Sequence, residues 1–205
     1  MLFSYKMTHD TGFAPNPFHG VLTLANCKPQ IRLKKHVGDY IAGFTSKRLI
    51  GDKVGEERLV YIMKVTKKLS YAEYFNDKHF QNKIPSESNL IAKAGDNIYK
   101  PAPGEKRGFI QLTNPYHNNK ENMDHDLGGK FVLLSNEFFY FGGGAIPIYK
   151  SKFNIKIPRV QSGSGVKTDN KTEIENLWQF LLENYKQNIA IYPPHSWKEN
   201  EPFNL

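Results

Sequence analysis

The one cysteine of the chain is the first residue whose type suggests chemistry. Cys27 is directly followed by Lys28, and Arg32 lies five positions further on. Neighbouring cations favour the thiolate, which is the nucleophilic form of cysteine. A free cysteine more often behaves as a small buried apolar group. We therefore favour packing as the role of Cys27 and keep nucleophilic catalysis as the alternative.

A second candidate is a group of histidine and aspartate residues in the second half of the chain. His117 precedes Asp124, His125 and Asp126 by a few positions. Imidazole and carboxylate groups together can bind a metal ion or exchange protons, although polar loops also carry such residues in solvated form. If the protein is an enzyme, Cys27, His117 and Asp126 are the candidate catalytic residues. We expect no metal and no cofactor.

A basic cluster indicates a phosphate-bearing ligand. Lys28, Arg32, Lys34 and Lys35 fall within eight residues, and the formal net charge of the chain is +8. Lysine and arginine side chains attract phosphates, and arginine can grip one phosphate through two parallel hydrogen bonds. We predict a basic hairpin here, with Arg32 as the main contact. A solvated basic face is the alternative interpretation.

Aromatic and amide side chains could hold a base. The chain has 11 tyrosines and 14 phenylalanines, which most often build cores but can also stack on bases. Asparagine and aspartate can read the donor and acceptor pattern of a base edge, or simply form a turn. The candidates are Tyr40, Phe44, Tyr140 and Phe141 for stacking, and Asp96 and Asn97 for base edges. Asn16, in the Pro-rich loop next to the basic cluster, is a further candidate for ligand binding.

The elements that must position these residues are mostly strands. Alternating apolar residues predict strands near the N-terminus, over 40–44 and, most clearly, over 59–69, which we expect to be a central strand. Ser70 and Glu73 form a capping-box pattern at the start of a short helix, and a longer helix is predicted over 171–188. Strands without regular helix alternation predict an α+β fold: a small, curved, mostly antiparallel sheet or partly closed barrel with packed helices.

Length and composition bound the class of protein. The 205 residues suit one domain, which we expect over 1–160, with a Gly/Ser connector, helix and tail over 161–205 packed on it. A single cysteine excludes an intramolecular disulfide. Neither a signal peptide nor an apolar run of membrane-spanning length is visible. We expect a soluble cytoplasmic protein without a membrane partner.

Several segments together resemble a known family. They are DTGFAPNPFHGVLTLANCKPQIR, VGDYIAGFTSK, RLVYIMKVTKKLSYAEYFND, GDNIY and VLLSNEFFYFGG, in this order. Their order and spacing resemble the nucleotide-modification-associated domain family, second type, over about residues 5–143. The resemblance implies a place in bacterial or phage systems that make or handle modified DNA bases. A shorter pattern, VGD before a strand and then LVYIMKV, is similar to PUA-like barrels, some of which hold a modified base in an aromatic cage.

Three functions follow from these observations. The first is a binding module for a nucleotide or modified base, free or in DNA, within a modification or defence system. The second is an enzyme on such a ligand that uses Cys27, His117 or Asp126. The third is a protein-interaction subunit without a ligand. The absence of established catalytic motifs places the binding module first.

Overall fold

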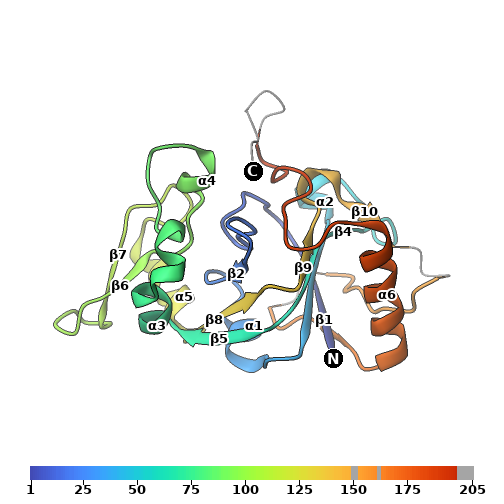
Figure 1. The fold of residues 1–205 in the computed structure, drawn as a ribbon, viewed down its shortest axis with the longest axis horizontal. Coiled ribbons are helices and arrows are strands. Elements are labelled where there is room, and N and C mark those ends of the chain that lie inside the picture. Colours follow the sequence, from blue (N-terminus) through green and yellow to red (C-terminus); the bar gives the residue numbers. More distant parts are fainter. Residues whose placement is uncertain (149–151, 161–162, 198–205) are drawn as a thin grey trace.

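The centre of the fold is a mixed sheet in the computed structural model, which describes residues 1–148, 152–160 and 163–197 (Figure 1). Its strand order is β10-β4-β3-β1-β11, and β9 also pairs with β4. Strands β1 and β3 pair in parallel, whereas all the other strand pairs of this sheet are antiparallel. The strands are β1 (Leu2–Lys6), β3 (Tyr40–Phe44), β4 (Arg58–Lys64), β9 (Phe138–Tyr140), β10 (Ile146–Pro147) and β11 (Val166–Thr168).

Two smaller sheets complete the strand structure. One has the order β2-β8-β5, and the other is the hairpin of β6 and β7. The α+β class is confirmed, but these sheets are not closed, so the predicted partly closed barrel is not confirmed. The strands are β2 (Leu22–Leu24), β5 (Lys67–Ser70), β6 (Tyr99–Pro101), β7 (Phe109–Gln111) and β8 (Phe131–Ser135).

The strand predicted over 59–69 is two strands in two different sheets. Its first part, β4, is central as predicted, because β3 lies on one side and β9 and β10 on the other. At Val65 the backbone N–H donates to Asp39, whereas the next N–H, of Thr66, donates to Leu134 of the smaller sheet. The chain therefore passes from one sheet to the other at this point. The two strands follow one another with two residues between them, so the sequence pattern shows one strand.

The predicted basic hairpin after Cys27 is a short helix, α1 (Pro29–Lys34). Pro29 starts the helix, where its missing N–H costs nothing. The predicted helix after Ser70 is confirmed as α3 (Tyr71–Asn76), with both hydrogen bonds of the capping box. The other helices are α2 (Lys47–Ile50), α4 (Leu90–Lys93), α5 (Lys120–Leu127), α6 (Lys171–Asn184) and two 3-10 turns over Lys78–Lys83 and Gly142–Gly144.

The C-terminal helix α6 covers one face of the large sheet (Figure 1). Its Leu177 and Trp178 belong to the same buried cluster as Leu2 and Phe139 of the sheet. The ring centroids of Trp178 and Phe139 lie 5.2 Å apart in an edge-to-face contact. In the part of the chain that the structure describes, no helix is long and apolar enough to cross a membrane.

Candidate functional site

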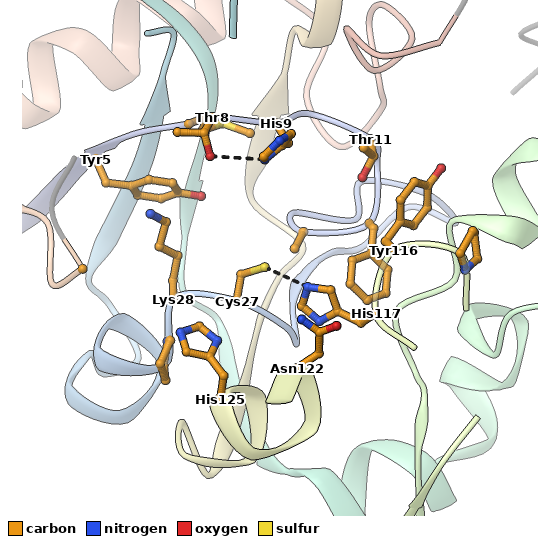
Figure 2. Close-up of a pocket in the computed structure, with 16 residues that line it drawn as sticks. Tyr5, Thr8, His9, Thr11, Cys27, Lys28, Tyr116, His117, Asn122 and His125 are labelled. Carbon is orange, nitrogen blue, oxygen red and sulfur yellow. Dashed lines mark hydrogen bonds between the residues drawn. The ribbon is translucent and has the colours of Figure 1, made fainter. Parts of the chain in front are cut away.

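Cys27 lies on a tight turn between β2 and α1. Its φ is 57° and that of Lys28 is 40°, so two consecutive residues other than glycine adopt the left-handed conformation. Each such residue costs about 1–3 kcal/mol and persists only where the surroundings hold it, often at functional sites. The turn directs the sulfur of Cys27 into a cavity (Figure 2).

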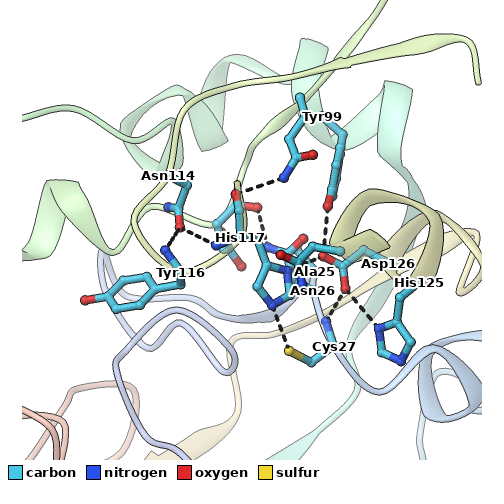
Figure 3. A network of polar contacts seen from close by, with 12 residues as sticks. Ala25, Asn26, Cys27, Tyr99, Asn114, Tyr116, His117, His125 and Asp126 are labelled. Carbon is cyan, nitrogen blue, oxygen red and sulfur yellow. Dashed lines mark hydrogen bonds and ion pairs between the residues drawn. The ribbon is translucent and has the colours of Figure 1, made fainter. Parts of the chain in front are cut away.

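The structure places His117 between Cys27 and Asp126 (Figure 3). His117 follows β7, and Asp126 lies on α5. The Nε2 atom of His117 is 3.5 Å from the Sγ atom of Cys27, and its Nδ1 atom is 2.6 Å from a carboxylate oxygen of Asp126. A potential nucleophile, an acid–base group and an orienting carboxylate therefore lie in series.

The carboxylate of Asp126 is fully buried and fixed from several sides. It accepts a hydrogen bond of 2.6 Å from the backbone N–H of Cys27 and one of 2.8 Å from the hydroxyl of Tyr99. Because the same carboxylate holds the backbone of Cys27 and the ring of His117, it sets their relative position. It also makes the Nε2 atom of His117 face the sulfur.

The surroundings of His117 favour its charged form. Burial acts to lower the pKa of His117, but the hydrogen bonds and charges of Asp126 and Cys27 outweigh it and raise the pKa to about 10. His117 is therefore protonated at neutral pH. An imidazolium 3.5 Å from the sulfur can form an ion pair with the Cys27 thiolate.

Arg32 supports this arrangement from the interior. Its side chain is fully buried and donates to the carbonyl oxygens of Cys27 at 2.7 Å, Asp126 at 2.7 Å and Phe131 at 2.9 Å. It also donates to the Tyr71 hydroxyl at 2.6 Å. The predicted main phosphate contact is therefore engaged inside the protein, where it holds the Cys27 turn to α5.

A cavity of about 720 Å³ opens beside the sulfur of Cys27 (Figure 2). Two aromatic groups form part of its wall: Tyr5 on one side, and Phe13 with Tyr116 on the other, their ring centroids 5.5 Å apart. The ammonium of Lys28 lies 4.6 Å from the centroid of the Tyr5 ring. Further polar residues line the cavity: Thr8, His9, Thr11, Asn122 and His125.

Three predicted ligand-binding residues, Asn16, Asp96 and Asn97, make buried polar contacts elsewhere. The ammonium of Lys83 is buried and donates to the side chain of Asn16 at 2.7 Å. Asp96 accepts from the hydroxyls of Thr23 at 2.5 Å and Tyr74 at 2.7 Å. Asn97 donates to two main-chain carbonyls. All three side chains are engaged by these neighbours, and none of them lines the cavity beside Cys27.

The predicted stacking residues also lie outside that cavity. Phe44, Tyr140 and Phe141 are fully buried in the two apolar clusters of the large sheet. Tyr40 is half-buried against Trp178 of α6, with the ring centroids 5.1 Å apart. In their place the structure offers Tyr5, Phe13 and Tyr116, which the sequence analysis missed. The only available signal was the position of Tyr116 next to His117.

The basic cluster is divided by the structure. Lys28 lines the cavity, whereas Lys34 is exposed on α1 outside it. Lys35 is nearly buried, with its ammonium 3.4 Å from the centroid of the Phe3 ring. Of the predicted ligand contacts, Lys28 is therefore the one placed at the cavity.

The same three residues could also hold a metal ion. One donor atom each of Cys27, His117 and Asp126 lies within 4.8 Å of the others. However, the Asp126 carboxylate already accepts from Cys27, Tyr99 and His117, so its oxygens are largely occupied. The hydrogen bond between His117 and Asp126 matches an acid–base pair more closely than a shared ligand set.

Comparison with known proteins identifies a family. The family model described as nucleotide modification associated domain 2 matches residues 1–201. No curated protein and no solved structure matches the chain. The predicted similarity to PUA-like barrels stays a prediction.

Proposed function

The chain belongs to the nucleotide modification associated domain 2 family, and we propose that it is an enzyme that acts on a nucleotide or modified nucleobase through Cys27. The observation that carries this proposal is the series Cys27, His117 and Asp126, with 3.5 Å and 2.6 Å between successive polar atoms. Catalysis thus takes precedence over the binding module that the sequence alone favours.

The arrangement supports a two-step substitution at an electrophilic carbon, such as a carbonyl. In the first step the Cys27 thiolate forms a bond to this carbon, and the leaving group departs with the proton from Nε2 of His117. In the second step His117 takes a proton from water or another acceptor, which attacks the same carbon and expels the thiolate. Asp126 keeps the imidazole oriented throughout.

A module that only binds a ligand does not require these features. Stacking and phosphate contacts need aromatic and basic groups, which the cavity supplies through Tyr5, Tyr116 and Lys28. They do not need a cysteine on a strained turn that is held by a buried carboxylate. The backbone strain at Cys27 therefore supports a catalytic role.

The proposal is tested by incubating the protein with a panel of nucleotides and base-modified nucleosides and following their conversion by liquid chromatography and mass spectrometry. Conversion should be lost in Cys27→Ser and His117→Gln. His79→Gln is a matched control, because His79 makes a similar 2.7 Å contact with Asp77 on the surface. It should behave as wild type.

Two results would contradict the proposal. Conversion by Cys27→Ser at the wild-type rate would exclude Cys27 as the nucleophile. Absence of conversion across the panel would favour the binding module over the enzyme. Elemental analysis of the purified protein tests the metal alternative. A stoichiometric transition metal, with conversion lost on chelation, would replace the nucleophile by a metal centre.

A further inference from the structure

Four basic side chains line the cavity beside Cys27: Lys28, His9, His117 and His125. The other ionisable groups in the lining are the thiol of Cys27 and the phenols of Tyr5 and Tyr116. Among the described lining residues there is no aspartate or glutamate, since Asp126 lies behind Cys27 and His117. A cavity with this composition concentrates anions and disfavours cationic ligands.

Lys28 is held for a contact that the protein itself does not supply. It is half-buried, and among the described residues no carboxylate pairs with its ammonium. Its ammonium lies over the face of the Tyr5 ring, 4.6 Å from the centroid. Burial lowers the pKa of Lys28, and the charge of Cys27 acts against this effect. A partly desolvated ammonium without a carboxylate partner binds a phosphate more strongly than an exposed lysine does.

The position of Lys28 also limits the kind of phosphate. Lys28 directly follows Cys27 in the turn, so its partner must enter the same cavity as the reacting carbon. A volume of about 720 Å³ lies within the range of sites that enclose one small molecule. A terminal phosphate monoester can be enclosed there, whereas the phosphodiesters of a polymer must continue out of the cavity in two directions.

We propose that the substrate is a free mononucleotide whose terminal phosphate binds Lys28 while its base packs against the aromatic wall of the cavity. This inference rests on the proposed function and adds its substrate class. The Phe13–Tyr116 wall borders His117, so a base packed there brings its substituents to Cys27. His9 and His125 add positive charge around the phosphate when protonated.

The test is calorimetric titration of Cys27→Ser, which prevents turnover, with deoxynucleoside 5′-monophosphates, the matching nucleosides and a single-stranded oligonucleotide. Lys28→Gln in this background should weaken monophosphate binding by about tenfold or more, the scale of a lost charge-assisted contact. Nucleoside binding should be unchanged. Lys28→Arg should retain binding, and Lys34→Gln, an exposed change on the adjacent helix, should have no effect.

Several outcomes would overturn the inference. They are equal monophosphate affinities with and without the Lys28 charge, tighter binding of the oligonucleotide than of any monophosphate, or no binding of any monophosphate. The proposed function fails separately. If conversion depends on Cys27 but binding does not depend on Lys28, the proposed catalysis stands and the mononucleotide substrate is excluded. If binding depends on Lys28 but no conversion depends on Cys27, the mononucleotide ligand stands and the proposed catalysis is excluded.

Discussion

Replacement of Arg32 by alanine separates the two roles that sequence and structure give this residue. The sequence predicts a phosphate contact, so Arg32→Ala should weaken ligand binding and leave folding intact. The structure instead shows a buried guanidinium that donates to three main-chain carbonyls and the Tyr71 hydroxyl. From this geometry we expect a loss of stability.

The size of the loss follows from the acceptors left behind. The Tyr71 hydroxyl shares its one proton between the carbonyls of Ala25 at 2.7 Å and Asp126 at 2.9 Å, so the Asp126 carbonyl keeps part of a hydrogen bond. The carbonyls of Cys27 and Phe131 lose the guanidinium outright. A buried polar group left without its partner costs about 1–3 kcal/mol. Two such groups give about 2–6 kcal/mol, a large part of the roughly 5–15 kcal/mol that keeps a typical domain folded.

Urea unfolding followed by tryptophan fluorescence measures this loss. Lys34→Ala is the control, because Lys34 lies two residues away on the same helix but is exposed, and it should change stability by no more than about 0.5 kcal/mol. If Arg32→Ala were as stable as Lys34→Ala and lost affinity for nucleotides, the structural reasoning would be refuted. The phosphate interpretation would then hold.

Three further predictions concern the groups around the site. The pKa of His117 is raised to about 10, so the contribution of His117 to stability should be complete below pH 6.5, its ordinary pKa, and disappear as the pH rises through 10. His117→Gln should therefore lower the free energy of unfolding, measured by urea titration, more at pH 6 than at pH 10. Lys83→Met should lower the thermal midpoint by several degrees in calorimetry, because the acceptors around its ammonium lose their donor; an unchanged midpoint would contradict this. Gly129→Ala should destabilise the fold and slow Cys27 alkylation, because an added Cβ would meet the guanidinium of Arg32; wild-type behaviour in both assays would contradict this.

Local signals in the sequence predicted local structure correctly. Ser70 and Glu73 form both bonds of the capping box, because these contacts join residues three positions apart. The break between β4 and β5 was missed because it depends on distant partners. Thr66 bonds to Leu134, and no alternation pattern in the segment records that pairing.

The site shows the same division between near and distant contacts. Cys27, His117 and Asp126 were identified as candidates from their chemistry, but 90 residues separate Cys27 from His117, and their contact could not be inferred from spacing. Arg32 was misread for a related reason. A basic residue in a basic cluster suggests an exposed face, whereas its partners are carbonyls, which are present at every position and leave no mark in the sequence.

The central claim is that His117 pairs with Cys27 and activates its sulfur. Because Cys27 is the one cysteine in the chain, the rate of iodoacetamide alkylation of the intact protein, followed by mass spectrometry, reports on this residue alone. We predict that wild type is alkylated at pH 6 much faster than His117→Gln, whose rate should rise only toward alkaline pH. The surface control His79→Gln should follow wild type. Identical pH profiles for wild type and His117→Gln would contradict the claim.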